Sequence, residues 1–163
     1  MTHDTTVPMH NDHLVLIDVE NVCGCSLPCR ADVERLKREL PNYVDDFAEA
    51  QVVVASSHKA GEAVMFGFPT ALRRLRSGPD GADLALLDVL SDRRVICRYK
   101  KVTICSGDGM FTEIVSELGM LGVEVVIVSL EGCVNNRLRM AASRCILMPR
   151  RELESGPTAR MVS

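Results

Sequence analysis

The sequence predicts an α/β fold, a doubly wound and mainly parallel sheet with helices between its strands. Short, uninterrupted apolar runs recur along the chain, as is typical of strands that are covered on both faces. Longer segments with helical apolar spacing separate them, and this alternation favours right-handed crossovers between parallel strands. The length of 163 residues suits one domain whose core needs no disulfide or metal.

Apolar runs mark the predicted strands. Four are clear and end in polar residues, and a fifth candidate lies near the end of the chain. Such short runs without alternating polar residues favour strands buried between two layers of helices. The runs are Leu14–Ile17, Val52–Ala55, Val102–Cys105, Val123–Val128 and Cys145–Met148.

Helical spacing predicts the segments between the strands. Pro41 ends the first helix, and a turn over residues 77–81 precedes the third. The second helix is interrupted near Gly67. The predicted helices are Ala31–Leu40, Gly61–Arg76, Ala82–Leu90, Phe111–Leu118 and Asn135–Ala142. Residues 1–13 are predicted to be a flexible N-terminus and residues 149–163 a loose tail, which leaves a domain over residues 14–148.

Composition excludes several classes of function. The net charge of −3 excludes binding of nucleic acid by bulk positive charge alone, and the 4% of aromatic residues leaves few side chains for base stacking. No apolar run in the sequence approaches 18 residues, and residues 1–13 lack the pattern of a signal peptide. The seven cysteines are an odd number and several lie in apolar runs, which favours a cytoplasmic protein over a disulfide framework.

Acidic residues stand where parallel α/β sheets bind ligands, beyond the carboxyl ends of the strands. Asp18 follows the first predicted strand, Asp108 follows the third, and Asp83 begins the helix after the glycine turn. Three carboxylates at one edge would repel one another unless a cation lay between them. Hard oxygen ligands suit Mg²⁺ or Mn²⁺. A single Asp after a strand serves equally well as a helix cap, so the prediction depends on the combination.

Three motifs occur in order on these elements: Leu16–Asn21 (LIDVEN), Gly81–Leu86 (GADLAL) and Ser106–Phe111 (SGDGMF). A GVEVVIV run and the segment Leu138–Ala142 follow them. In content and order, these segments resemble the NYN domain, a LabA-like branch of the PIN-like nuclease superfamily. The resemblance covers about residues 14–148.

The resemblance implies a three-layer α/β/α sandwich of PIN-like fold and a metal-dependent ribonuclease that uses Mg²⁺ or Mn²⁺. It implies that Asp18, Asp83 and Asp108 are catalytic metal ligands, and that Asn21 orients the first acid or touches the substrate. An amide can also fix a carboxylate without adding charge. Further residues that could support the site are Glu20, Asp88, Ser106 and Glu113.

Two positions depart from the family pattern. Met110 stands where the family usually has a second acid, and Ser143 stands where it often has an aspartate. The loss of one carboxylate makes a tight two-metal site less favourable than a single metal completed by water. The alternative hypothesis is therefore a catalytically silent NYN module that binds RNA or a protein partner.

Basic residues are the predicted contacts with RNA. Arg73, Arg74 and Arg76 precede the glycine turn to Asp83, and Lys59 follows the second strand. The basic stretch over residues 93–101 is interpreted as a solvated face. A homodimer is compatible with the sequence, but no feature requires one.

Two other interpretations are weaker. Cys23, Cys25 and Cys29 lack the paired Cys-x-x-Cys spacing of a structural zinc site and are predicted to be free thiols. The Ser106–Gly109 motif is also similar to a motif of haloacid-dehalogenase phosphatases. Those enzymes need an Asp-x-Asp pair at the first strand, where this chain has Asp18-Val19-Glu20.

Overall fold

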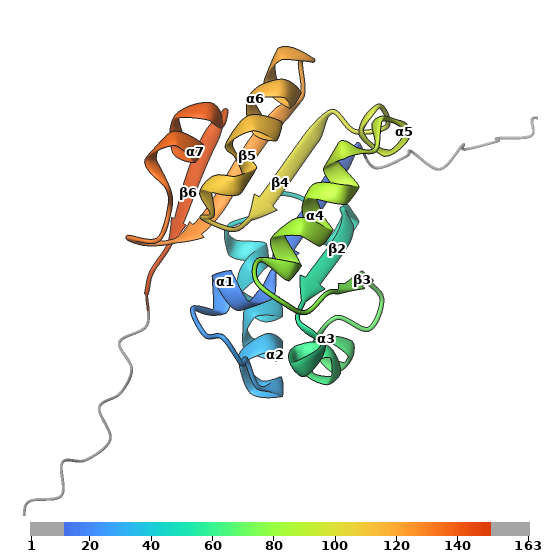
Figure 1. Ribbon diagram of the computed structural model, residues 1–163, viewed down its shortest axis with the longest axis vertical. Coiled ribbons are helices and arrows are strands. Elements are labelled where there is room, and N and C mark those ends of the chain that lie inside the picture. The colour runs from blue at the N-terminus through green and yellow to red at the C-terminus, as the bar shows by residue number, and fades with distance from the viewer. Residues whose placement is uncertain (1–11, 151–163) are drawn as a thin grey trace, which may run out of the picture.

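Every strand in the computed structural model is parallel to its neighbours, and the model describes residues 12–150. Within that range the sheet has six strands in the order β3-β2-β1-β4-β5-β6 (Figure 1). They are β1 (His13–Asp18), β2 (Gln51–Ser56), β3 (Leu72–Leu75), β4 (Lys101–Cys105), β5 (Glu124–Leu130) and β6 (Arg144–Met148). Residues 1–11 of the predicted N-terminus and 151–163 of the predicted tail lie outside this range.

Helices connect successive strands. They are α1 (Val19–Cys23), α2 (Arg30–Glu39), α3 (Gly61–Gly67), α4 (Gly81–Ser91), α5 (Arg93–Ile96), α6 (Thr112–Met120) and α7 (Asn136–Ala141). Single 3-10 turns occupy Leu40–Asn42, Phe47–Glu49, His58–Ala60 and Gly109–Phe111. Over residues 12–150, no helix is long and apolar enough to cross a membrane.

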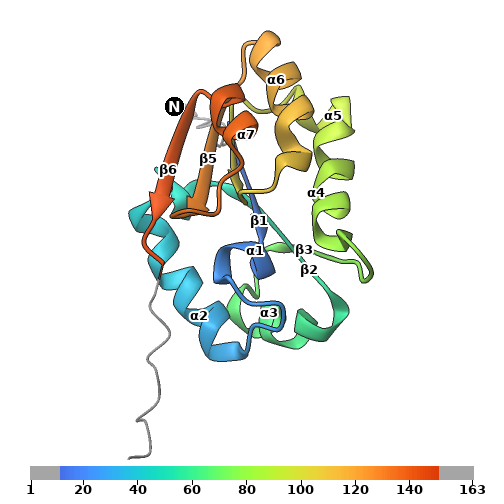
Figure 2. The same cartoon turned by 60° about the vertical axis from the view of Figure 1, so that its left-hand side comes forward.

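The sheet lies between two layers of helices, which confirms the α/β fold and the three-layer arrangement (Figure 2). Alternate residues of β1 enter opposite cores: Leu14 and Leu16 pack beneath α4 and α6, whereas Val15 and Ile17 pack against α1, α2 and α3. A strand that is buried on both faces must be apolar at every position, and this is the pattern that the sequence shows. The five predicted strands are confirmed as β1, β2, β4, β5 and β6, and β3 is a sixth strand that the sequence does not predict.

The predicted helix over residues 61–76 is correct only in its first half. Helix α3 ends at Gly67, and Leu72–Leu75 form the edge strand β3, which pairs with β2 from Val53↔Leu72 to Ser56↔Leu75. Gly67 packs so closely on α2 that an added Cβ would lie 2.4 Å from Cγ1 of Val33. Helix α3 is thus fixed against α2, and the chain turns through Phe68 and Pro69 into the sheet.

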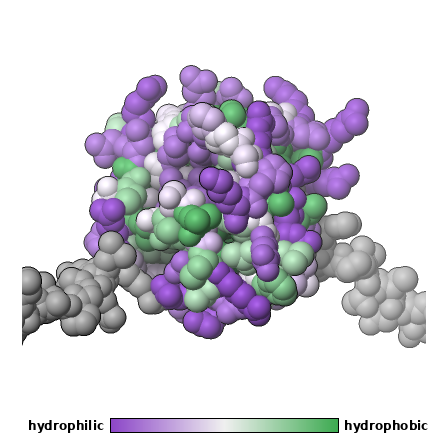
Figure 3. Space-filling view, turned by 60° about the horizontal axis from the view of Figure 1, so that its bottom comes forward, coloured by the Kyte–Doolittle hydropathy of each residue, from purple (hydrophilic) through white to green (hydrophobic). Residues whose placement is uncertain are grey.

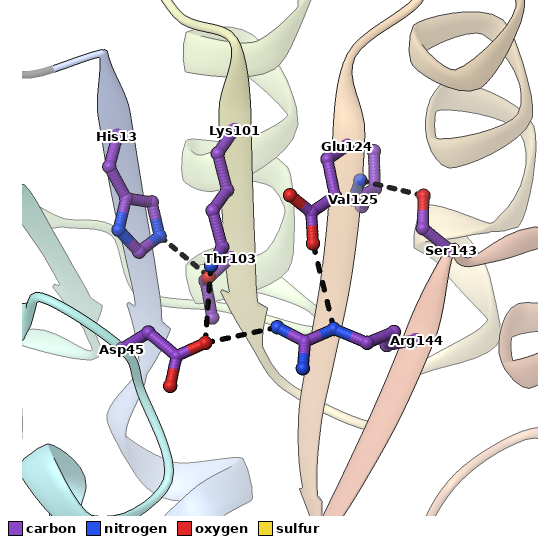
Figure 4. Close-up of polar contacts among 8 residues, drawn as sticks. All are labelled: His13, Asp45, Lys101, Thr103, Glu124, Val125, Ser143 and Arg144. Atoms are coloured by element: carbon purple, nitrogen blue, oxygen red, sulfur yellow. Dashed lines mark hydrogen bonds and ion pairs between the residues drawn. The ribbon is translucent and has the colours of Figure 1, made fainter.

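Charged residues join the strands at the edge of the sheet where they begin (Figure 4). The carboxylate of Asp45 pairs with Lys101 Nζ at 3.4 Å and with Arg144 Nη2 at 3.1 Å, and Arg144 Nε also reaches Glu124 at 3.5 Å. These contacts link the starts of β4, β5 and β6. The acids of the predicted site lie at the opposite edge, where the strands end.

Candidate functional site

The centre of the sheet is the point at which the strand order reverses. β1 lies between β2 and β4, so the chain leaves the two middle strands toward opposite sides of the sheet. Ligands of open α/β sheets bind in the crevice outside the carboxyl ends of strands at such a reversal. Asp18 ends β1, and Ser106, Gly107 and Asp108 directly follow β4.

Asp18 is the N-cap of α1 and is only 3% exposed. Its Oδ1 accepts a hydrogen bond from the backbone N–H of Asn21 at 3.4 Å, and its Oδ2 accepts one from the hydroxyl of Ser106 at 3.4 Å. The Ser106 hydroxyl oxygen in turn accepts a hydrogen bond from the backbone N–H of Asp108 at 3.3 Å. Asp18 therefore has both the capping role of a post-strand aspartate and a direct connection to the loop after β4.

Asn21 links the two central loops. Its side-chain Oδ1 accepts a hydrogen bond from the backbone N–H of Gly107 at 3.0 Å. The resemblance implies that Asn21 orients the first acid or touches the substrate. In the structure the backbone N–H of Asn21 donates to Asp18, whereas its side chain binds the loop after β4. A Cβ on Gly107 would lie 2.3 Å from the carbonyl oxygen of Cys133, so only glycine fits where the loop after β4 packs against the loop after β5.

A group of carboxylates lies between α4 and the loop after β4. Three aspartates each contribute one carboxylate oxygen, and these three oxygens lie within 4.8 Å of one another. The aspartates are Asp80, Asp83 and Asp108. Asp83 is 8% exposed, and its Oδ1 is buried without a hydrogen-bond partner. A buried, unpartnered carboxylate oxygen is costly unless a proton or cation satisfies it. These hard oxygen donors fit a divalent cation such as Mg²⁺ or Mn²⁺.

Burial and neighbouring negative charge raise the pKa values of two acids of this site, Asp18 and Asp83. Burial is the largest cause that raises the pKa of Asp18 to about 8, followed by a hydrogen bond to Asp83. Burial also raises the pKa of Asp83, as do the charges of Asp108 and Asp80, although the hydrogen bond with Asp18 acts in the opposite direction. Without a cation, these surroundings favour a proton held on Asp18 and directed toward Asp83.

The predicted supporting residues lie in different surroundings. Ser106 contacts Asp18 directly. Glu20 accepts a hydrogen bond from the backbone N–H of Ser57 at 2.6 Å, which joins α1 to the loop after β2. Asp88 lies on the exposed side of α4, 3.4 Å from Arg76, outside the carboxylate group, and Glu113 lies exposed in the first turn of α6.

The predicted basic residues separate in the structure. Arg73 donates hydrogen bonds to the carbonyl oxygens of Phe68 and Pro69 at 3.4 and 3.2 Å. Its neighbour Arg74 lines, with Arg76, a shallow hollow of about 280 Å³ between β3 and α4. Lys59 lies exposed in the turn after β2. Figure 3 shows the lower end of the molecule in Figure 1, where hydrophilic and hydrophobic residues are mixed.

Asp80 is the member of the carboxylate group that the sequence does not predict as a site residue. It lies in a left-handed conformation, φ 55°, directly before α4. The turn that contains it packs on the end of β3, where a Cβ on Gly81 would lie 2.3 Å from the carbonyl oxygen of Arg76. The signal available in the sequence is an acid next to a glycine in a turn that precedes Asp83.

The cysteines lie apart from this group. All seven are free thiols, and Cys25, Cys29 and Cys97 are exposed. Among residues 12–150, the group of side chains arranged to bind a metal consists of the three aspartates and includes no cysteine.

Comparison with known proteins gives one family and two similar structures. The NYN domain matches residues 13–149. A protein of unknown function from Vibrio parahaemolyticus RIMD 2210633 has a TM-score of 0.54 and 15% identity, over 91% of this chain and 96% of that chain. The YcaC gene product from Escherichia coli, called an octameric hydrolase of unknown specificity, has a TM-score of 0.46 and 17% identity, over 85% and 76%.

The similarity to the Vibrio protein concerns the fold alone. No curated protein matches this chain. The NYN match, in contrast, extends from the start of β1 to just beyond β6 and includes every strand of the sheet. The chain belongs to the NYN domain family.

Proposed function

We propose that this protein is a Mg²⁺- or Mn²⁺-dependent ribonuclease that hydrolyses phosphodiester bonds. The observation that carries the proposal is the convergence of acids from three separate segments. Asp83 and Asp108 lie in one carboxylate group, and Asp18 is hydrogen-bonded to Asp83. They meet at the edge of a NYN-family sheet where ligands of such folds bind.

The side chains divide into those that bind the metal and those that position them. Asp18, Asp83 and Asp108 would hold the cation: Asp83 and Asp108 belong to the carboxylate group, and Asp18 borders it beside Asp83. A bound Mg²⁺ or Mn²⁺ supplies Lewis acidity, which lowers the pKa of water and offsets charge on the phosphate. Ser106 and Asn21 fix the loop that carries Asp108 relative to β1, through the contacts with Asp18 and Gly107.

RNA is the proposed partner. Arg74 and Arg76 line a hollow beside the turn that leads to Asp83, and Lys59 is exposed after β2. Local cations of this kind bind a phosphate backbone without the large positive net charge that the chain lacks. The proposal places the protein in the cytoplasm, where its seven thiols would stay reduced.

Cleavage of labelled single-stranded RNA in the presence of Mn²⁺ tests this proposal. Wild type should cleave several unrelated RNAs, and EDTA should abolish product. The variants Asp18→Asn, Asp83→Asn and Asp108→Asn should each lose at least about 100-fold in rate, because each removes charge from the site. Asp12→Asn, which changes an acid paired with Lys100 at the opposite edge, is the matched control. Cleavage by the three variants at the wild-type rate would refute the proposal.

A silent module that binds RNA is the second candidate, and Met110 favours it. Met110 is 38% exposed, and its backbone N–H donates to Asp108 Oδ1 at 2.8 Å, so a non-acidic side chain stands beside a proposed ligand. A silent module should bind RNA equally well with EDTA and yield no product. Cleavage that begins only in Met110→Asp would support it, whereas cleavage by wild type would exclude it.

A further inference from the structure

We infer that Asp80 is an additional metal ligand, which in this chain takes the place of the acid absent at position 110. The inference rests on the proposed metal-dependent function and specifies the ligand set of the same site. It differs from the set that the family motifs imply, because those motifs contain no acid at the position of Asp80.

Distance is the first argument. Asp80, Asp83 and Asp108 each place a carboxylate oxygen within 4.8 Å of the other two. Mg²⁺ holds oxygens at about 2.0–2.1 Å, so opposite ligands of one ion lie about 4 Å apart, and a small movement of the exposed Asp80 side chain lets one cation contact all three oxygens. Asp18 is outside this group and contacts Asp83 and Ser106 from the buried side. The side chains closest to sharing one ion are therefore those of Asp80, Asp83 and Asp108.

The buried oxygen of Asp83 is the second, independent argument. Asp83 is more than nine-tenths buried, and among residues 12–150 no N–H or hydroxyl group donates to its Oδ1, which leaves only the carboxyl proton of Asp18 or a cation to satisfy this carboxylate. A cation held by the group would satisfy this buried carboxylate. Asp80 is exposed, so it would bind the ion from the solvent side while Asp83 binds from the protein side.

The position of Asp80 depends on an unusual backbone. Asp80 has φ 55° and ψ 25°, a region that L-residues rarely adopt, although Asp and Asn enter it more readily than other residues. Asp46 has nearly the same conformation, φ 54°, also directly before a helical turn, but at the opposite edge and outside the carboxylate group. The chain therefore contains its own matched control.

Calorimetric titration of the full-length protein with Mn²⁺ tests the inference without any assay of cleavage. Asp80→Asn keeps the left-handed backbone and removes one charge, so it should raise the Kd for Mn²⁺ about tenfold or more. Asp46→Asn should leave the Kd within about twofold of wild type. Asp80→Gly also suits the backbone, and it should match Asp80→Asn if the latter folds poorly.

The outcomes separate this inference from the proposed function. If Asp83→Asn loses Mn²⁺ binding while Asp80→Asn and Asp80→Gly bind like wild type, Asp80 is not a ligand and the proposed function stands. If wild type itself binds no Mn²⁺ at millimolar concentration, both proposals are wrong. An equal loss of Mn²⁺ affinity in Asp80→Asn and Asp46→Asn would also overturn the inference, because the loss would then follow from the change in the net charge of the protein.

Discussion

The side-chain oxygen of Asn21 accepts the backbone N–H of Gly107 at 3.0 Å, and this contact joins the loop after β1 to the loop after β4. The two loops carry Asp18 and Asp108. Because they follow adjacent parallel strands, a single amide is sufficient to fix their relative position. Asn21 is therefore a positioning residue, and its amide accepts this hydrogen bond without adding another negative charge beside Asp18.

Asn21→Ala should reduce the activity of the site more strongly than the stability of the fold. The change leaves the part-buried Gly107 N–H without its acceptor, which should lower the free energy of unfolding by roughly 1–2 kcal/mol. If the protein is a nuclease, the displaced loop should reduce RNA cleavage about 10- to 100-fold. Denaturant unfolding and the cleavage assay measure the two effects. Asn42→Ala, at an exposed position, is the control, and equal losses in both variants would contradict the positioning role.

The metal-free protein should lose stability as the pH rises from about 4 to about 8. The pKa of Asp18 is about 8 in the folded protein against 3.8 as its ordinary value, so in this window the folded state keeps a proton that the unfolded chain has lost. A rise in pH therefore favours unfolding. The stabilising contribution is complete below about pH 4 and disappears through pH 8.

Asp18→Asn provides the control for this pH dependence. The amide keeps a donor toward Asp83 but cannot titrate. Denaturant unfolding in EDTA at several pH values should show wild type losing stability relative to Asp18→Asn as the pH rises from 4 to 8. A constant difference between the two proteins across that range would show that Asp18 has an ordinary pKa.

Divalent metal should reverse this loss. A cation that binds only the folded state at 100 times its Kd adds about 2.7 kcal/mol, which for a chain of this size should raise Tm by about 5–10 °C. The shift should grow from pH 6 to pH 8, because metal must displace the proton of Asp18. Thermal unfolding with Mn²⁺ and then with excess EDTA measures it. An identical Tm with and without Mn²⁺ at pH 8 would contradict a metal site.

Arg76 should contribute to RNA affinity through charge. Removal of one phosphate contact in Arg76→Ala should weaken binding and reduce the slope of log K against log salt by about 0.7. Asp88→Asn should have the opposite effect on affinity, because Asp88 pairs with Arg76 at 3.4 Å. Fluorescence anisotropy at several salt concentrations measures both. Lys37→Ala, on the exposed side of α2, should leave the slope unchanged, and the same slope in Arg76→Ala would contradict the predicted contact.

The central strands could be predicted because burial on both faces leaves an unbroken apolar run, as in Leu14–Ile17. β3 could not. Its four residues, Leu72–Leu75, are all exposed at the edge of the sheet and include two arginines, so no run marks the strand. Pairing with β2, a contact with a distant segment, decides its conformation.

The candidate site also contains residues that could be predicted from the sequence and one that could not. The meeting of Asp83 and Asp108 could be expected from their places at the carboxyl edge of a parallel sheet. Asp80 could not be identified, because its approach depends on a left-handed turn and on the packing of Gly81 against Arg76. Asp88 is five residues beyond Asp83, about 140° away around the helix, and this rotation places it on the exposed side.

Crystals grown with Mn²⁺ and measured at the manganese absorption edge would test the central claim most directly. The account predicts an anomalous peak within about 2.0–2.6 Å of carboxylate oxygens of Asp83 and Asp108, at the carboxyl edge between β1 and β4. Crystals at millimolar Mn²⁺ with no peak at these carboxylates would contradict it, even with the NYN fold intact.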